Sequence, residues 1–264
     1  MTSLPHVSRE TASGAGGTLP ANVQRRIRDL VAEYGRQAEV EGREVEGRLG
    51  ALLEHLAAAG GRAPTTVTAP AAAVDVHVAD ALAALALDPV REARCIADIG
   101  AGAGVPGLVL AAALEGAGAQ VRLLDSQQAK CSFVAAAITR MGLRNARVVW
   151  SRVESWTEGA GAHDLVTARA LAAQPVVLEY AAPLLGVGGR LVDWRGARRP
   201  EEEEAAARAA PELGMRPVEV RRVLPFAAAE DRHLHVFEKV AATPARFPRR
   251  PGAALKNPLG AART

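Results

Sequence analysis

A glycine-rich stretch at residues 96–107, IADIGAGAGVPG, contains the residue types best suited to hold a small ligand. A short apolar run ends at Asp98, and glycine then occupies every second position from Gly100 to Gly104. Glycine accepts the φ values of a tight turn and lets a ligand lie against bare backbone. Pro106 suits the first turn of a helix, whose free N–H groups attract anionic groups. The pattern predicts a strand, a turn and a helix start that together bind a small anionic or zwitterionic cofactor.

Asp125 is a second candidate ligand residue, because it ends the next apolar run, VRLLD, after the glycine loop. It lies at the distance from the loop where an acidic residue usually accepts hydrogen bonds from a ribose. An aspartate at the end of a strand can also cap the following helix, and the pattern alone leaves both roles open. Its position after the glycines favours the ligand role.

Two cofactor classes are compatible with the loop. Gly102, Gly104 and Gly107 satisfy the dinucleotide fingerprint G-x-G-x-x-G, which keeps an NAD(P)- or flavin-dependent oxidoreductase as an alternative. Two features favour S-adenosylmethionine. Asp98 places an acid directly before the phosphate cradle, and the chain after Gly189 predicts an antiparallel hairpin rather than a second mononucleotide-binding half.

Strands and helices alternate after the glycine loop, which predicts an α/β fold with a mostly parallel sheet covered on both faces. Too few residues separate the last two strands for a helical crossover, so these strands should pair antiparallel. A ligand in such a sheet lies at the carboxyl ends of the strands. We expect strands at 96–98, 121–124, 146–150, 165–168, 190–192, 218–223 and 234–237, and helices at 106–115, 127–141, 174–185 and 201–213.

Three amphipathic helices are predicted before the loop, because apolar residues recur at helical spacing within residues 23–34, 45–56 and 74–85. Their apolar stripes need a surface to cover, so we expect a helical cap that packs on the following domain. His77 and Asp80 share one face of the third helix. They form either a functional pair or a local hydrogen bond.

Several motifs together are similar to those of the RsmG family, the small-subunit ribosomal RNA guanine-N7 methyltransferase G, also called glucose-inhibited division protein B. The likeness extends over about residues 21–259 and is carried by DIGAGAGVPG, LLDS, SRVE, TARALA and RHLHVFEKVAATPARFPRRPG, in that order. It implies a Rossmann-like class I S-adenosylmethionine-dependent methyltransferase sheet with an antiparallel last strand. The expected divisions are a disordered leader (1–20), an N-terminal helical subdomain (21–90), a methyltransferase domain (91–242) and a basic C-terminal segment (243–264).

The resemblance also implies which residues contact S-adenosylmethionine. Gly100, Gly102 and Val105 would line the methionine side, and Asp125 would hold the ribose. Val153 and Glu154 would flank the adenine, and Arg169 would close the site from the fourth strand. Other roles stay open, since Val153 could be a core residue, Glu154 a surface acid and Arg169 part of a structural ion pair. Two departures affect substrate contacts: Arg195-Gly196 replaces the more usual Lys-Gly, and Thr65 to Thr68 replace a turn like Asn-Leu-Thr.

The implied reaction is methyl transfer to N7 of a guanosine in 16S rRNA. N7 carries an in-plane lone pair and no proton, so this reaction needs alignment and no general base. We assign no catalytic base. The position after the fourth strand reads TARA rather than the Asn/Asp-Pro-Pro-aromatic motif of exocyclic-amine methylation, and neither Cys95 nor Cys131 is placed as a nucleophile for cytosine C5. These absences favour a ring nitrogen.

Basic residues without acidic neighbours occupy the C-terminal segment 243–264 and predict an RNA surface. The Phe247 ring among them could stack on a base, although a solvated terminus is the simpler interpretation. A second basic patch lies on the first helix. The expected RNA contacts are Arg246, Arg249, Arg250 and Lys256, with Arg25, Arg26 and Arg28 as the patch on the helix.

Composition limits the remaining possibilities. A length of 264 residues with 49% apolar residues allows one α/β domain with an appendage. Two cysteines in no paired spacing predict neither a disulfide framework nor a metal site. The first residues lack a signal-peptide pattern and no apolar run is long enough to span a membrane. We expect a cytoplasmic monomer whose partner is 16S rRNA or the small ribosomal subunit; the non-enzymatic alternative is an RNA-binding protein that only carries the cofactor.

Overall fold

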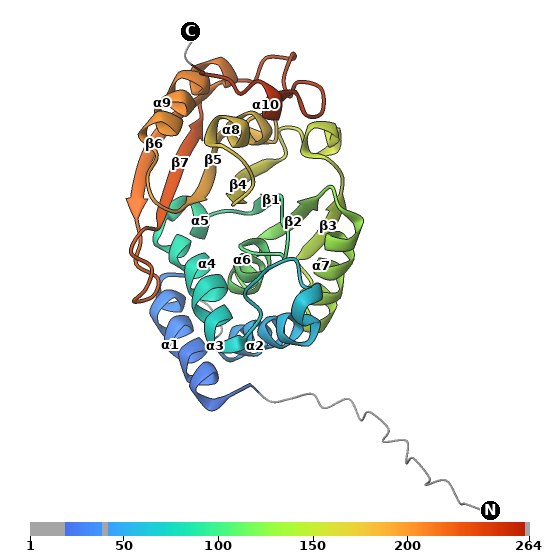
Figure 1. The fold of residues 1–264 in the computed structure, drawn as a ribbon, viewed down its shortest axis with the longest axis vertical. Coiled ribbons are helices and arrows are strands. Elements are labelled where there is room, and N and C mark those ends of the chain that lie inside the picture. The colour runs from blue at the N-terminus through green and yellow to red at the C-terminus, as the bar shows by residue number, and fades with distance from the viewer. Residues whose placement is uncertain (1–18, 39–41, 262–264) are drawn as a thin grey trace, which may run out of the picture.

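A seven-stranded sheet forms the centre of the computed structural model, which describes residues 19–38 and 42–261 (Figure 1). The strand order is β3-β2-β1-β4-β5-β7-β6. The first five strands pair in parallel, whereas β7 is antiparallel to both β5 and β6. The predicted mostly parallel sheet with an antiparallel end is therefore confirmed. The strands are β1 (Cys95–Ile99), β2 (Gln120–Asp125), β3 (Ala146–Trp150), β4 (His163–Arg169), β5 (Leu185–Arg195), β6 (Met215–Arg222) and β7 (His233–Lys239).

Alternating strand residues build one apolar core on each face of the sheet. In β1, Ile96 packs into the first core and Ala97 into the second, as the period of two requires. The first core lies against α1 (Ala21–Ala38), α2 (Gly42–Ala59), α6 (Gly107–Leu114) and α7 (Gln128–Met141). The second lies against α8 (Gln174–Ala181) and α9 (Pro200–Ala209). The N-terminal helices share the first core with the sheet, as expected of a helical cap; the boundaries at 20, 90 and 242 stay predictions.

The third predicted helix is not a regular α-helix. It consists of α3 (Pro70–Ala73), a π-helical turn (Val74–Ala79), α4 (Asp80–Leu82) and a 3₁₀ turn (Ala83–Ala86), followed by α5 (Asp88–Arg91). The N–H of Asp80 donates to the carbonyl of Asp75, five residues earlier, and so bypasses the carbonyl of Val76. Arg169 donates to that Val76 carbonyl at 3.0 Å. The irregular turn therefore offers a main-chain acceptor to a side chain at the end of β4.

Two helices, α8 and α9, end earlier than the sequence predicted. The helix expected at 174–185 ends at Ala181, and β5 already begins at Leu185. Pro183 lies two residues after this end; it has no N–H to continue the helical hydrogen bonds, and it disfavours the helical conformation at Ala182 before it, which explains the early stop. The helix expected at 201–213 begins at Pro200 and changes after Ala209 into a 3₁₀ turn, Ala210–Leu213. Both errors concern boundaries and leave the sheet topology unchanged.

The C-terminal segment, here residues 243–261, packs on the second face beside α8 and α9 (Figure 1). Phe247 is only 7% exposed and belongs to the second core, as does Ala254 in α10 (Ala253–Lys256). The Phe247 ring is therefore not free to stack on a base, which corrects the sequence-based expectation. Most of the predicted leader, residues 1–18, and Arg263 lie outside the described residues. None of the helices described here is long and apolar enough to cross a membrane.

Candidate active site

The glycine loop connects β1 to α6 at the carboxyl end of the sheet. Gly100, Gly102 and Gly104 all have positive φ, at 69°, 56° and 87°. A Cβ at Gly100 would lie 2.5 Å from Leu171 Cδ1. The loop is held against β2, since the Ala101 N–H donates to the Leu124 carbonyl at 2.8 Å. The alternating glycines are thus required by the backbone, as the sequence predicted.

Asp98, in β1, holds the glycine loop through hydrogen bonds of its carboxylate. Its carboxylate is 1% exposed and accepts hydrogen bonds from the Gly107 N–H at 3.1 Å and the Thr167 hydroxyl at 2.8 Å. A Cβ at Gly107 would lie 2.7 Å from the Asp98 carboxylate, so only glycine permits this approach. Burial raises the pKa of Asp98 to about 6, against which the Thr167 and Gly107 hydrogen bonds act. Asp98 therefore joins β1, α6 and β4 beneath the loop.

The raised pKa of Asp98 predicts a pH-dependent stability. An ordinary aspartate has a pKa of 3.8, so the folded chain holds this proton more tightly than the unfolded chain. The contribution of this proton to the free energy of unfolding is complete below pH 3.8 and is lost as pH rises to about 6. The contribution amounts to roughly 2–3 kcal/mol at most. Asp98→Asn has no such proton, so the difference in unfolding free energy between parent and variant should change across this window. Urea unfolding of both proteins at pH 4 to 7 measures it; a constant difference would contradict the prediction.

A cleft of about 300 Å³ opens beside the glycine loop. Of the predicted cofactor residues, Gly100, Asp125, Val153 and Glu154 line it. The Asp125 carboxylate accepts from the Gly102 N–H at 3.1 Å and the Gln127 N–H at 2.9 Å. Asp125 therefore fixes the turn before α7 and borders the cleft; it does not cap α7, whose first residue is Gln128, and its role as a ribose ligand stays a prediction. The sequence missed Lys130, Leu171, Tyr180 and Leu255 in this lining.

Glu154 also holds the C-terminal segment against the cleft. Its carboxylate accepts a hydrogen bond from the Gly252 N–H at 3.0 Å. Burial, and after it the neighbouring Glu154, raise the pKa of Tyr180 to about 12, so its phenol stays protonated. These contacts place Leu255, from α10, at the rim of the cleft. No local pattern around Leu255 could have indicated this, because its neighbours in space come from distant elements.

Two loop residues are placed differently from the expectation. The Val105 side chain is 8% exposed and packs in the first core, and it does not border the cleft. Gly102 acts through its N–H, which is bound to Asp125, and is not part of the cleft wall. An apolar residue before a helix start has a core to fill, which explains the position of Val105.

Arg169 is also turned away from the cofactor cleft. Its guanidinium donates to Asp80 at 2.8 Å, to the Val76 carbonyl at 3.0 Å and to His77 Nδ1 at 3.0 Å. Because Nδ1 accepts, His77 carries its proton on Nε2, which donates to the Val67 carbonyl at 2.9 Å. Burial and Arg169 lower the pKa of His77, so the ring is neutral. Arg169 thus forms an ion pair with Asp80, and His77 and Asp80 meet through it; a contact between Arg169 and the cofactor stays a prediction.

A second, larger cavity of about 610 Å³ adjoins the cofactor cleft. Both are bordered by Ala170 and Ala172, so the chain directly after β4 forms a shared wall. Ala170 has a φ of 52°, an unusual value for a residue with a Cβ. Such backbone outliers cluster at ligand sites.

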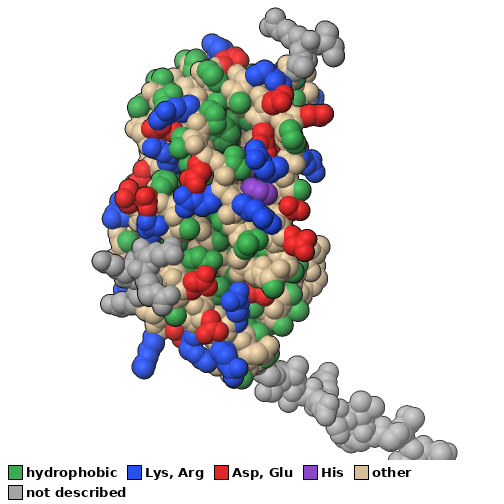
Figure 2. Space-filling model, turned by 90° about the vertical axis from the view of Figure 1, so that its left-hand side faces the viewer, with side chains coloured by type: hydrophobic (Ala, Val, Ile, Leu, Met, Phe, Trp, Pro, Cys, Tyr) green, Lys and Arg blue, Asp and Glu red, His purple; other side chains and the backbone are tan. Residues whose placement is uncertain are grey.

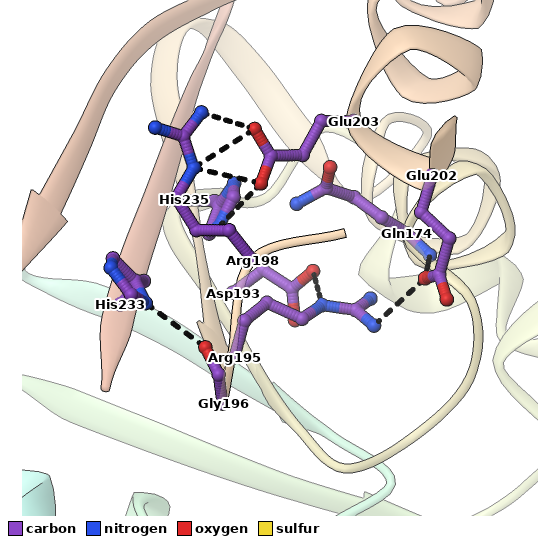
Figure 3. A network of polar contacts seen from close by, with 9 residues as sticks. All are labelled: Gln174, Asp193, Arg195, Gly196, Arg198, Glu202, Glu203, His233 and His235. Atoms are coloured by element: carbon purple, nitrogen blue, oxygen red, sulfur yellow. Dashed lines mark hydrogen bonds and ion pairs between the residues drawn. The ribbon is translucent and has the colours of Figure 1, made fainter. Parts of the chain in front are cut away.

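Polar side chains from β5, β7, α8 and α9 line this second cavity (Figure 3). Arg195 Nε donates to Asp193 at 2.7 Å, and Arg195 Nη1 lies 3.5 Å from Glu202. Burial raises the pKa of Asp193 to about 6, although Arg195 acts to lower it. Burial lowers the pKa of His235 to about 4, so this imidazole is neutral near pH 7. The sequence signals for this cluster were the Arg195-Gly196 pair and the RHLH motif that contains His235.

The C-terminal arginines are not equivalent. Arg249 binds the buried Glu179 in bidentate fashion, with Nε to Oε1 at 2.8 Å and Nη2 to Oε2 at 2.6 Å, and also donates to the Asn257 carbonyl. Its guanidinium is thus engaged by Glu179 and Asn257, and its assignment as an RNA contact stays a prediction. Arg246 is exposed and pairs with Glu212 at 3.0 Å. Arg250 and Lys256 are exposed and make no ion pair within residues 19–38 and 42–261.

The sheet order, the glycine loop and the acid at the end of β2 define the class as an S-adenosylmethionine-dependent methyltransferase. A solved S-adenosylmethionine-dependent methyltransferase from Aquifex aeolicus shares the fold, with a TM-score of 0.51 and 17% identity over 64% of this chain and 93% of that one. The model of the GidB family, rRNA small subunit methyltransferase G, matches residues 49–234. The chain belongs to this family.

Relatives named ribosomal RNA small subunit methyltransferase G agree with this assignment. The protein from Syntrophomonas wolfei is 39% identical over 189 residues, which cover 70% of this chain and 86% of the relative. The protein from Rubrobacter xylanophilus is 35% identical over 257 residues, which cover 94% of this chain and 97% of the relative. The similarity thus includes the N-terminal helices and the C-terminal segment as well as the sheet.

Proposed function

We propose that the chain transfers a methyl group from S-adenosylmethionine to N7 of a guanosine in 16S rRNA. The observation that carries this proposal is the pair of adjoining cavities with a shared wall at Ala170 and Ala172, in a chain of this family. One cavity fits the cofactor, because it combines a glycine backbone, the Asp125 carboxylate and apolar walls. The other fits a base that enters from the opposite side. We also propose that the chain acts as a monomer in the cytoplasm, because its RNA substrate is found there.

The residues contribute binding and alignment. Asp125 would hold ribose hydroxyls, Val153 and Glu154 the adenine side, and Gly100 leaves room for the methionine side. Bound S-adenosylmethionine supplies an electrophilic methyl on a sulfonium sulfur. With the cofactor held there, the N7 lone pair would form the N–C bond as the C–S bond electrons return to sulfur, so the base would gain one positive charge and no residue would have to move a proton. The protein therefore acts by placing the two partners in line, which can supply several kcal/mol of barrier reduction.

Methyl incorporation tests the proposal directly. Tritiated S-adenosylmethionine is supplied with naked 16S rRNA, an assembly intermediate or the intact small subunit, and the product is mapped by strand cleavage specific for 7-methylguanosine. We expect label at a single guanosine in at least one substrate. Label on another atom or no label in any substrate would overturn the proposal. Calorimetry with S-adenosylhomocysteine against NADH separates it from the oxidoreductase alternative, and cofactor binding without methyl transfer would favour the RNA-binding alternative.

We further propose that Arg250 and Lys256 contact RNA phosphates. Both are exposed and unpaired within the described part of the chain, in a segment that is held firmly to the protein. On the face that carries β6 and α9, basic and acidic groups are interspersed, so this face presents no patch of one sign (Figure 2). Arg246 is a weaker candidate because Glu212 is its neighbour, and Arg25 and Arg28 on α1 are exposed candidates on the opposite face of the sheet.

Replacing Arg250 and Lys256 by alanine should flatten the salt dependence of RNA binding. Each lost phosphate contact should reduce the slope of log affinity against log salt by about 0.7–0.9, because fewer counterions are released. The double variant should keep the melting temperature and cofactor affinity of the parent. Arg144→Ala, an exposed arginine at the other end of the sheet, is the matched control. Equal slopes for the parent and the double variant would place the RNA contacts elsewhere.

A further inference from the structure

Buried polar side-chain atoms without hydrogen bonds are concentrated around the second cavity. Seven such side-chain atoms occur in the described residues, and five of them belong to residues that line this cavity. They are Asp80 Oδ1, Gln174 Nε2, Gln174 Oε1, Arg195 Nη2 and His235 Nε2. Asp80 Oδ1 lies 3.4 Å from Arg232 Nε, and His235 Nε2 lies 4.0 Å from Glu203. A buried polar atom without a hydrogen bond is destabilising, so the Gln174 amide and Arg195 Nη2 are the groups for which a ligand would supply partners.

Gln174 and Arg195 are the best placed of these residues (Figure 3). Gln174 is 2% exposed; its amide lies near Asp193, whose pKa it acts to lower, but neither amide atom makes a hydrogen bond of regular geometry. Glu202 Oε2 connects the two residues. It accepts a hydrogen bond from the main-chain N–H of Gln174 at 3.4 Å and lies 3.5 Å from Arg195 Nη1. Asp193 fixes the Arg195 guanidinium from the other side and leaves Nη2 unpaired. The cavity thus presents a donor of fixed orientation beside an amide.

We propose that Gln174 and Arg195 recognise the guanine base of the substrate, an inference that rests on the proposed function. Guanine carries an acceptor, O6, next to a donor, N1–H. Arg195 Nη2 can only donate and therefore pairs with O6, while Gln174 Oε1 accepts from N1–H. Adenine has a donor and an acceptor in these two places. An amide can rotate to accommodate it, but a guanidinium cannot, so Arg195 sets the selectivity.

The position of the cavity agrees with this role. Its wall at Ala170 and Ala172 also borders the cofactor cleft, so a base held by Gln174 and Arg195 lies next to the methyl donor. The volume of about 610 Å³ is in the range of small-molecule sites. Enzymes that modify a base commonly take it out of its stack into such a pocket. The nearby His235 is neutral and adds a polar wall without another charge.

Base analogues at the target position test the recognition. Inosine keeps O6 and N1–H, so the parent should methylate it within about tenfold of guanosine. 2-Aminopurine lacks both groups but keeps N7, and its kcat/KM should fall at least about 1,000-fold, since a site built to bind a hydrogen-bonding group strongly rejects an analogue without it. Parent activity on 2-aminopurine close to that on guanosine would overturn the inference while leaving the proposed function intact.

Gln174→Leu separates recognition from structure. It should lower kcat/KM for guanosine by about 10- to 100-fold and reduce the preference over 2-aminopurine by a similar factor. Its melting temperature should equal or exceed that of the parent, because the variant removes two unpaired buried atoms. Affinity for S-adenosylhomocysteine should not change. Gln120→Leu, at the exposed first position of β2, is the matched control and should behave as the parent.

A binding measurement keeps the inference testable without turnover. Guanosine monophosphate is titrated into the parent loaded with S-adenosylhomocysteine, and chemical shift changes are followed. We expect binding that is weakened about tenfold or more in Gln174→Leu and is unchanged in Gln120→Leu. Equal binding by the parent and Gln174→Leu, or no binding by the parent, would overturn the role of this cavity. Failure of methyl transfer with intact guanosine binding would instead count against the proposed function.

Discussion

Gly100→Val should lower the affinity for S-adenosylhomocysteine by at least about 100-fold in calorimetry. The new Cβ would lie 2.5 Å from Leu171 Cδ1, and Leu171 lines the cofactor cleft, so the side chain must move into the space that the ligand needs. The backbone at position 100 has a φ of 69°, where a side chain adds roughly 1–2 kcal/mol of strain. A 100-fold loss corresponds to about 3 kcal/mol, which steric exclusion and distortion of the loop can jointly supply.

A matched glycine separates loss of the site from loss of stability. Gly118, in the turn between α6 and β2, has a φ of 81°, and no atom lies within 4 Å of a Cβ placed there. Gly118→Val should therefore carry a similar backbone strain without touching the cleft. We expect both variants to have a lower melting temperature and only Gly100→Val to lose cofactor affinity. A folded Gly100→Val protein with parental affinity would show that the cofactor does not lie against this loop.

Local patterns explain why much of the fold could be predicted. The glycines at 100, 102 and 104 need positive φ in a single short loop, and this requirement is visible without knowing the rest of the chain. The alternation of strand and helix signals also gave the order of elements. The irregular turn at Val74–Ala79 was missed, because its apolar spacing matches an ordinary helix. Its Val76 carbonyl accepts a hydrogen bond from Arg169, 93 positions away, and such a distant contact is not visible in the local pattern.

Site residues were harder to predict, because their roles depend on partners distant in the chain. Arg169 has the position of a cofactor residue at the end of a strand, but Asp80, 89 positions earlier, binds its guanidinium. Val105 follows the loop in sequence, but its side chain turns into the core. Gln174 has no local signal, and only the tertiary structure shows that its amide is buried without a hydrogen bond of regular geometry. Spacing identifies the loop of a site more readily than the surrounding walls.

Residues 243–264 contain no acidic residue, which suggested a basic surface free to bind RNA. This prediction was incomplete, because glutamates from other elements bind the segment. Glu179, Glu154 and Glu212 all lie in other elements and bind Arg249, Gly252 and Arg246. Net charge along a segment therefore does not reveal whether its arginines are available for RNA. Glu179 is 1% exposed, and within the described residues the Arg249 guanidinium compensates its charge, with the main-chain N–H of Arg249 as a further donor.

Arg249→Ala should be strongly destabilising. It would leave the buried Glu179 carboxylate without its partner, and breaking a buried ion pair from one side typically costs about 3–5 kcal/mol. The C-terminal segment should then detach, which exposes Phe247 and withdraws Leu255 from the cofactor cleft. We expect a lower melting temperature, faster amide hydrogen exchange in residues 243–261 and weaker binding of S-adenosylhomocysteine.

Two further variants distinguish an anchor from an ordinary surface contact. Arg246→Ala removes an exposed ion pair whose side chains are 62% and 44% exposed, and it should change stability by less than about 1 kcal/mol. Glu179→Gln combined with Arg249→Met removes both charges but keeps an acceptor for the main-chain N–H of residue 249, so it should recover most of the lost stability. If Arg249→Ala were no more destabilising than Arg246→Ala, the Arg249–Glu179 pair would not be what holds the segment. The slope of RNA affinity against salt would then have to be measured for Arg249 as well.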